Sequence, residues 1–332
     1  MRALICREYG PPDVLKLENV PQPSLPAGNV RIAVSRTTVT FAVILGLAGK
    51  HQNKPGLPYI PGGEVTGKVI EVAADVQGFT PGQRVVAMIG AGGYAEQAVA
   101  PAANCWAIPE ALSDEHAIVT CGTHASLFLA LDWLARLQAG ETLLVHGAGG
   151  GSGLGAVILG KAMGARVIAS AGGPEKLAVA RRNGAAETID YRNEAVRERV
   201  LALTGGRGAD VVFDPVGGEA FEQSLRCVAP EGRLIPYGFA GGTIPQIPAN
   251  ILLVKNISVI GFYWGYYLGW GKQKPPQATT ERLRATMAML LQWSLEGRLP
   301  PMPCTVLPME NCREALRLVA EREAIGKILL AI

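Results

Sequence analysis

The most informative stretch for chemistry is GAGGGSGLG (147–155), in which six of nine residues are glycine. Glycine has no side chain, so such a stretch lets the chain turn sharply and lets another group approach the backbone. The apolar run TLLVH (142–146) precedes it, and LGAVILGKAMG (154–164), with helical apolar spacing, follows it. A strand, a glycine loop and a helix in this order are typical of a phosphate-binding turn.

The glycines are spaced as Gly147-x-x-Gly150-x-x-Gly153. One glycine would permit the turn off the strand, another would admit a pyrophosphate, and the last would let helix and strand pack closely. The alternative is a flexible connection, but the strand–helix units that follow favour a dinucleotide site. A second cluster, Gly90-Ala91-Gly92-Gly93, has no helix behind it, and we interpret it as a hairpin or bend.

The adenosine end of the dinucleotide can also be predicted. An NAD site usually has an acid about 20 residues after the first glycine, whereas the second strand here ends in Ala169–Gly173 without one. Lys176 and Arg192 follow instead. A missing acid and nearby bases favour a 2′-phosphate, hence NADPH over NADH, although both cations could also be ordinary solvated surface charges.

The surrounding pattern predicts an α/β fold. From residue 142 strands alternate with helices, which indicates a doubly wound parallel sheet of the Rossmann type. The first hundred residues contain short β-branched runs separated by turns (30–39, 64–73, 84–89), which predict a small β domain. A helix should begin at Ser113, and the tail after 280 should pack back onto the β domain. One more strand is expected at 256–264.

Composition excludes several function classes. The formal net charge is +3 without a basic run, which gives no support to nucleic-acid binding. No run of 18 apolar residues predicts a membrane span, and the N-terminal residues MRALICREYG lack a signal-peptide pattern. The six cysteines are widely spaced, so we expect reduced thiols in a cytoplasmic protein and no metal site.

Several motifs resemble the zinc-free, NADPH-dependent quinone oxidoreductases, the zeta-crystallin-like branch of the medium-chain dehydrogenase/reductase superfamily. They include LPYIPGGEVTGKV (57–69), GGYAEQ (92–97), LLVHGAGGGSGLGAV (143–157), TGGRGADVVFDPVGG (204–218) and GKILL (326–330). The resemblance implies a GroES-like catalytic domain (1–120 and 262–332), a Rossmann NADPH-binding domain (121–261) and an active site in the cleft. It also implies a homodimer formed through the edge strand near 256–264.

The resemblance further implies a set of cofactor-binding positions, divided by the part of NADPH that each would contact. The positions are Gly150, Gly151, Ser152 and Gly153 for the pyrophosphate; Ser170, Lys176 and Tyr191 for the adenosine phosphate; Val216, Gly217, Gly238 and Phe239 after the fourth and fifth strands; Thr123, Phe262 and Tyr263 for the nicotinamide; and Lys327 near the C-terminus.

The substrate side departs from the family pattern. Family members often read Asn-Phe-Ala-Asp where this chain has Thr40–Val43, and often have Tyr at the position of His51. Thr40, His51 and Trp264 are the candidate substrate-side residues, although the first two could be an ordinary strand threonine and a loop histidine. The aromatic run FYWGYYLGW (262–270) could form core, a dimer interface or a wall for a planar substrate.

Zinc-dependent relatives would have Cys at Thr40 and His at Gly63, so the resemblance implies no catalytic zinc. The predicted activity is hydride transfer from NADPH to a quinone. The alternatives are reduction of the C=C bond of an unsaturated carbonyl and a low-turnover NADPH-binding redox sensor. The residues identify no general acid.

Overall fold

A computed structural model describes all 332 residues, which form two compact units. Unit 1 comprises Met1–Gly122, Trp264–Gly297 and Pro303–Ile332, and unit 2 comprises Thr123–Tyr263 and Arg298–Met302. The junctions lie two residues beyond the expected ones at 120 and 261. The expected ranges also omitted Arg298–Met302 from the Rossmann unit, where both Nε and Nη2 of Arg298 donate to the carbonyl of Ala162, at 3.1 and 2.8 Å.

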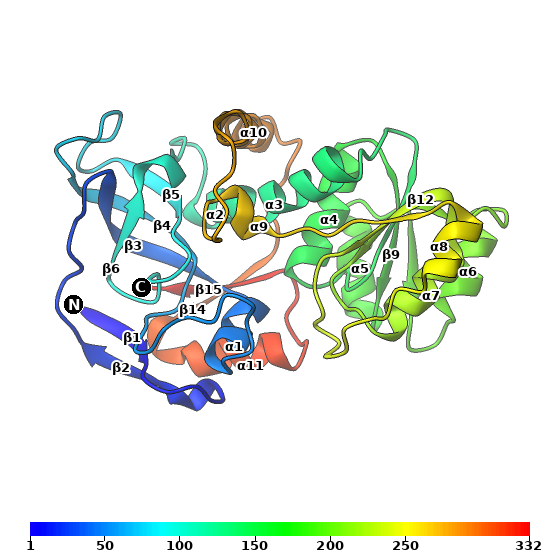
Figure 1. Ribbon diagram of the computed structural model, residues 1–332, viewed down its shortest axis with the longest axis horizontal. Coiled ribbons are helices and arrows are strands. Elements are labelled where there is room, and N and C mark those ends of the chain that lie inside the picture. Colours follow the sequence, from blue (N-terminus) through cyan, green and yellow to red (C-terminus); the bar gives the residue numbers. More distant parts are fainter. The chain divides into compact units, whose positions relative to one another are not determined.

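The elements follow one another along the chain as Figure 1 labels them. The strands are β1 (Arg2–Cys6), β2 (Leu15–Asn19), β3 (Asn29–Val39), β4 (Glu64–Val72), β5 (Arg84–Met88), β6 (Gln97–Pro101), β7 (Cys105–Ala107), β8 (Thr142–Val145), β9 (Arg166–Ala171), β10 (Glu187–Asp190), β11 (Ala209–Asp214), β12 (Val228–Pro236), β13 (Ser258–Val259), β14 (Cys304–Pro308) and β15 (Lys327–Ala331). The α-helices are α1 (Phe41–Leu47), α2 (Asp114–Ile118), α3 (Ala125–Phe128), α4 (Gly151–Ala162), α5 (Pro174–Arg182), α6 (Val196–Leu203), α7 (Glu219–Cys227), α8 (Ala249–Lys255), α9 (Trp264–Tyr267), α10 (Gln277–Leu295) and α11 (Cys312–Ala320). The remaining helical segments are the 3₁₀ turns η1 (Pro12–Val14), η2 (Ala102–Asn104) and η5 (Met309–Asn311) and the π segments η3 (Val119–His124) and η4 (Leu129–Leu134).

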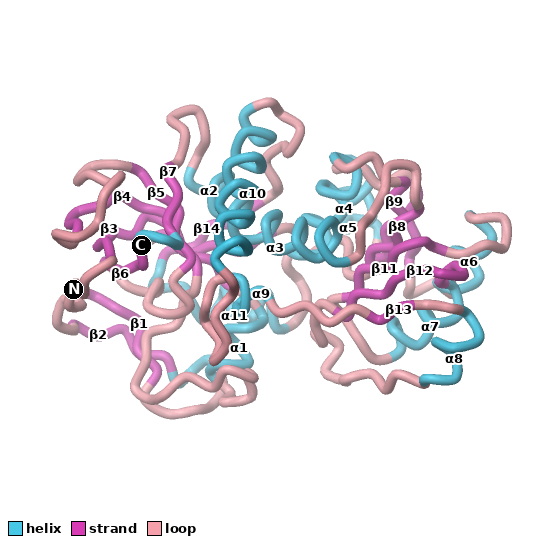
Figure 2. The backbone as a smooth tube through the Cα atoms, turned by 45° about the horizontal axis from the view of Figure 1, so that its top comes forward, coloured by secondary structure: helices cyan, strands magenta, loops and turns pink.

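Unit 2 is built on a six-stranded parallel sheet with the order β10-β9-β8-β11-β12-β13. This order confirms the predicted doubly wound fold, and its connections reverse direction between β8 and β11. Helices α4 and α5 cover one face, and α6, α7 and α8 cover the other (Figure 2). Dinucleotides bind beside the carboxyl ends of strands at such a reversal, so the residues that follow these strands are the ones to inspect.

The core under α6, α7 and α8 explains why these strands are continuous apolar runs. Its members are apolar residues from both the strands and the helices, including Leu144, Ile168, Val200, Phe221 and Leu234. Strands buried on both faces need apolar side chains at every position instead of an alternating pattern.

Unit 1 contains a seven-stranded sheet with the order β14-β15-β3-β4-β5-β7, in which β6 also pairs with β3. The C-terminal strand β15 pairs antiparallel with β3, with Ile328 opposite Val39, so both ends of the chain contribute to one sheet (Figure 1). The strands β1 and β2 form a separate antiparallel pair. The sequence had predicted β3, β4 and β5 but neither β1 and β2 nor the short helix α1.

The helical segment Asp114–Leu134 begins where the sequence predicted, because the Ser113 side chain accepts a hydrogen bond from the N–H of His116 at 3.1 Å. Two π segments interrupt it, which apolar spacing did not indicate. By length and composition alone it could cross a membrane, but 83% of its apolar window is buried in the protein. The core helix of a globular protein passes the same test.

The predicted strand at 256–264 was too long. Only Ser258 and Val259 pair with β12, and the N–H of Ile260 adds one bond to the carbonyl of Leu234. Asn256, in the left-handed conformation with φ 52°, ends the unpredicted helix α8 just before it. The aromatic side chain of Phe262 stacks on Tyr237 after the ladder has ended.

The helix predicted at 218–232 was also too long. Helix α7 ends at Cys227, because Val228 enters the sheet opposite Ala209.

Candidate functional site

The glycine loop makes a turn that only bare backbone permits. Gly147 has φ +61°, a conformation that other residues rarely adopt. A Cβ atom on Gly153 would lie 2.0 Å from the carbonyl oxygen of Gly147, which no side chain tolerates. The loop is also tied to the next strand, because the N–H of Ala148 donates to the carbonyl of Ser170 at 3.0 Å.

Helix α4 begins inside the glycine run, three residues earlier than its apolar spacing indicated. Gly150 is the N-cap residue, and its carbonyl accepts the first helical bond from Leu154 at 2.7 Å. The N–H groups of Gly151, Ser152 and Gly153 therefore precede the helical hydrogen-bond pattern. Such groups, together with the helix dipole, bind anions such as phosphate.

Lys176 lies over this loop. A Cβ on Gly149 would be 2.6 Å from both Cβ and Cγ of Lys176, so its aliphatic stem packs directly on the glycine backbone. Lys176 stands in the first turn of α5, after the second strand. The structure thus brings together a cation and a glycine loop that are 27 positions apart in the chain.

Tyr191 and Arg192 fold back over the end of β9. A Cβ on Gly172 would lie 2.7 Å from the hydroxyl oxygen of Tyr191 and 2.8 Å from Nε of Arg192. Both residues are exposed. Lys176 and Arg192 therefore come from different strand–helix units to the same edge of the sheet, as a 2′-phosphate site requires.

Two features of this edge were missed or different. Asp190, at the end of β10, accepts hydrogen bonds from the N–H groups of Arg192 and Gly173, both at 3.2 Å. These bonds, that from Arg192 first, lower the pKa of Asp190, so an anion holds the turn. The hydroxyl of Ser170 is buried and has no hydrogen-bond partner, so it is not presented to solvent.

A buried carboxylate shapes the turn after β11. One oxygen of Asp214 accepts hydrogen bonds from the N–H groups of Val216 at 2.7 Å and Gly217 at 3.0 Å, whereas the other is buried without a partner. Gly217 has φ +73°, and a Cβ there would be 2.8 Å from the carbonyl of Thr243. The two predicted residues of this turn are thus positioned by Asp214, which sequence reasoning did not select.

His146, the last residue before the glycine loop, is buried beside this carboxylate. Its Nε2 lies 2.8 Å from the hydroxyl of Ser224, which itself donates to the carbonyl of Ala220. The hydroxyl proton is thereby used, so Nε2 of His146 donates. Burial lowers the pKa of His146, against the opposing effect of the Asp214 carboxylate.

The predicted residues after β12 and β13 lie around a tyrosine that the sequence analysis overlooked. Tyr237 follows β12 directly, and its ring stacks on Phe262 at 5.6 Å between centroids. The neighbouring Gly238 and Tyr263 are half-buried, and Phe239 is 37% exposed. A tyrosine beside a predicted glycine was the available signal.

Thr123 is buried in the π segment η3 and packs against α4, where a Cβ on Gly155 would be 2.8 Å from its Cγ2.

The three substrate-side candidates all belong to unit 1, and no hydrogen bond or ring contact joins them. Thr40 is the N-cap residue of α1, although its side chain makes no cap hydrogen bond. His51 accepts from the N–H of Asn53 at 3.2 Å within its own loop. Trp264 begins α9, and its indole N–H is buried without a partner.

The rest of the aromatic run also packs within unit 1. A Cβ on Gly90 would lie 3.4 Å from the ring of Trp270, and Tyr266 and Tyr267 form an edge-to-face pair.

Lys327 is 8% exposed and lies 3.9 Å from Glu64, whose same carboxylate oxygen accepts from the hydroxyl of Thr38 at 2.8 Å. A Cβ on Gly122 would come within 2.6 Å of that oxygen. Glu64 is therefore held inside unit 1 by a threonine, a lysine and a close backbone.

The residues do not fit a metal ion. No group of three His, Cys, Asp or Glu side chains is placed to hold one. At Gly63, where zinc-dependent relatives would have a histidine, a Cβ would be 3.2 Å from the carbonyl of Gly90. Structural and catalytic zinc sites use at least three protein ligands, which this region does not supply.

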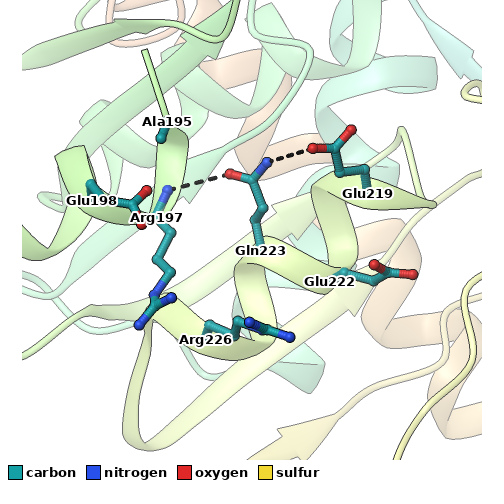
Figure 3. Close-up of a pocket in the computed structure, with 7 residues that line it drawn as sticks. All are labelled: Ala195, Arg197, Glu198, Glu219, Glu222, Gln223 and Arg226. Carbon is teal, nitrogen blue, oxygen red and sulfur yellow. Dashed lines mark hydrogen bonds between the residues drawn. The ribbon is translucent and has the colours of Figure 1, made fainter.

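A separate hollow of about 360 Å³ lies on unit 2 between α6 and α7 (Figure 3). It is lined by Ala195, Arg197, Glu198, Glu219, Glu222, Gln223 and Arg226. The side chains of Gln223 and Glu219 are hydrogen-bonded to each other at 3.1 Å. Charges of both signs line the hollow and it contains no glycine-loop residue, so its lining selects no ligand class.

Comparison with known proteins places the chain in a family. Residues 26–110 match the model of the alcohol dehydrogenase GroES-like domain, and residues 151–281 match that of a zinc-binding dehydrogenase. The quinone oxidoreductase-like protein 2 homolog of Nematostella vectensis is 39% identical over 99% of this chain and 88% of that protein. The chain belongs to the medium-chain dehydrogenase/reductase family, in its quinone oxidoreductase-like branch.

Solved structures of this family share the whole fold. The quinone oxidoreductase of Thermus thermophilus, studied also in complex with NADPH, is 32% identical with a TM-score of 0.83, and each chain is covered fully. The Escherichia coli quinone oxidoreductase, complexed with NADPH, is 25% identical with a TM-score of 0.90 over the full length of both chains. The family is one of oxidoreductases, so the chain is an enzyme of that class. The zinc in the name of the matched domain model has no counterpart in the donor set described above.

The buried histidine predicts a pH dependence of stability. As pH falls through about 6.5 the unfolded chain protonates its histidines, whereas folded His146 stays neutral to lower pH. The unfolded state then binds more protons, so the free energy of unfolding decreases with falling pH, by up to about 1.4 kcal/mol per pH unit. In His146→Gln this part of the slope between pH 7 and 5.5 should disappear in urea titrations. His51→Gln, at a half-exposed position, is the control, and equal slopes in wild type and His146→Gln would contradict the assignment.

Proposed function

We propose that the enzyme is an NADPH-dependent, zinc-independent oxidoreductase that transfers hydride to a quinone. The observation that supports the cofactor best is the packing of Lys176 on the glycine loop, with Arg192 over the adjacent strand end. Family membership supports the reaction class, and the relatives described above are named as quinone oxidoreductases.

The residues of unit 2 fit NADPH. The N–H groups of Gly151, Ser152 and Gly153 would bind the pyrophosphate, because they lie at a helix N-terminus where a Cβ on Gly153 would obstruct the turn. Lys176 and Arg192 would hold the 2′-phosphate through charge-assisted hydrogen bonds. NADPH supplies the hydride when bound, and the protein contributes binding, orientation and exclusion of water.

Zinc independence is part of the proposal and rests on the donor set. Glu64 is engaged by Thr38 and Lys327, and the positions Thr40 and Gly63 offer no thiolate or imidazole. A reduced quinone is a stabilised anion that can take its proton from water, so the proposal assigns no general acid.

The defining experiment follows NADPH oxidation at 340 nm with 1,4-benzoquinone, 9,10-phenanthrenequinone and a small alkenal. We expect turnover with the quinones, preference for NADPH over NADH, and no change after incubation with EDTA. A saturated alkenal product without quinone reduction would identify a C=C reductase instead. Tight NADPH binding without turnover on any acceptor would indicate a redox sensor, and loss of activity on chelation would contradict zinc independence.

The cofactor preference should depend on two cations. Lys176→Ala and Arg192→Ala should each raise the KM for NADPH about tenfold while leaving the KM for NADH nearly unchanged, because each removes a charge-assisted contact to the phosphate that NADH lacks. Arg182→Ala, which removes an exposed cation at the opposite end of α5, is the matched control. Parallel changes for both cofactors would show that neither cation recognises the 2′-phosphate.

We also propose a homodimer formed along β13 and α8. β13 is an edge strand, paired on one side only within the six-stranded sheet. Leu253 and Val254 on α8 are 75% and 72% exposed, and Ile244 in the preceding loop is 68% exposed. An apolar helix beside an open strand edge invites association, and a second copy would pair both at once.

This dimer can be tested by sedimentation or light scattering. Leu253→Glu should convert a dimer to a monomer at micromolar concentration, because it buries a charge in an apolar contact. Leu17→Glu, at an exposed leucine of β2 in unit 1, should leave the dimer intact. A monomeric wild-type protein would rule out the proposed interface.

A cytoplasmic location is the last part of the proposal. All six cysteines are free in the structure, and five of them are buried. Unpaired thiols suit a reducing compartment. Isolation of the native protein with oxidised cysteines from an extracytoplasmic fraction would contradict it.

A further inference from the structure

A chain of hydroxyl groups connects β12 to the π segment η3. The hydroxyl oxygen of Tyr237 lies 2.8 Å from Oγ of Ser126, and that Oγ lies 2.9 Å from the carbonyl oxygen of Thr123. A carbonyl can only accept, so Ser126 donates its single proton to Thr123. Tyr237 must therefore donate to Ser126. The direction of both bonds is fixed by this chemistry.

The chain ends on an unusual piece of helix. Thr123 lies in the π segment Val119–His124, and π turns are rare insertions that depend on local contacts. The Ser126 hydroxyl gives the Thr123 carbonyl a donor there. On its other side Thr123 packs with its methyl group against Gly155 of α4, the helix that follows the glycine loop.

The ring of Tyr237 makes a second set of contacts. It stacks on Phe262, with 5.6 Å between centroids and 13° between planes, and packs against Phe213 at 4.8 Å. Phe213 is in β11, Tyr237 follows β12, and Phe262 follows β13. One side chain thus joins the three strands of the second half of the sheet to the π segment.

The sheet's connectivity says which part of a dinucleotide these strands serve. In a doubly wound sheet of this order each half binds one mononucleotide at the carboxyl ends of its strands. The glycine loop, Lys176 and Arg192 belong to the half made of β8, β9 and β10. The ends of β11, β12 and β13, which Tyr237 joins, serve the other nucleotide.

We propose that Tyr237 is a positioning residue for the nicotinamide half of the cofactor site, an inference that rests on the proposed function. Its hydroxyl, through Ser126, holds the π segment that carries Thr123, and its ring holds Phe262. It acts through these residues and takes no part in the transfer itself. Loss of its hydroxyl weakens binding of the nicotinamide half and leaves the adenosine half unaffected.

The test compares two ligands by calorimetric titration: NADPH, and 2′,5′-ADP, which occupies only the adenosine half. In Tyr237→Phe, which keeps the ring, the Kd for NADPH should rise about threefold to tenfold, the range for loss of one hydrogen bond, and the Kd for 2′,5′-ADP should not change. Ser126→Ala should do the same. The double variant should be no worse than either single one, because both remove the same chain.

A matched control lies on the same π segment. Thr120 and Ser294 form a buried hydroxyl pair at 2.8 Å, and Ser294 donates to the carbonyl of Leu290 at 3.1 Å. Ser294→Ala removes a pair of the same kind within unit 1, so it should lower the melting temperature and leave both Kd values unchanged.

The outcomes separate the inference from the proposed function. If wild type binds both ligands and Tyr237→Phe binds them equally well, or loses affinity for both to the same extent, the positioning role is wrong while the proposed function stands. If wild type binds neither ligand, the proposed function falls and this inference falls with it. A loss confined to NADPH, with unchanged affinity for 2′,5′-ADP, supports the role.

Discussion

The close approach of Gly153 to the carbonyl of Gly147 is the constraint on which the nucleotide site depends. A Cβ at Gly153 would lie 2.0 Å from that oxygen, so the contact exists only because the side chain is absent. It allows α4 to begin at Gly151, with the first helical bond already made by Leu154. The anion-binding N–H groups, and the surface on which Lys176 packs, are consequences of this one turn.

The carboxyl ends of the parallel strands carry a cost in buried polar groups. One oxygen of Asp214 orders the turn at Val216 and Gly217, but its other oxygen is buried without a partner. His146 beside it remains neutral because burial lowers its pKa. Such arrangements destabilise a fold unless something offsets them, and they are found where backbone groups must be aimed at a ligand.

The sequence predicted the elements whose patterns are local. Alternating apolar runs and turn residues were enough for the Rossmann sheet, and Ser113 marked the start of the long helix, as its cap bond shows. The errors have tertiary causes. Asn256 adopts a left-handed conformation that ends α8, and Phe262 leaves the ladder to stack on Tyr237, so the edge strand is two residues long. The π segments depend on side-chain contacts that apolar spacing does not record.

The sequence by itself determined the family, the doubly wound fold and the glycine loop, because these rest on residue types at short, regular separations. Only the tertiary structure decided which distant residues meet. It laid Lys176 on Gly149, folded Arg192 over Gly172, and linked Tyr237 through Ser126 to Thr123. It also buried Ser170, which a motif match had assigned to the cofactor. These contacts follow from strand order and crossover connections, which join parts of the chain that no local pattern relates.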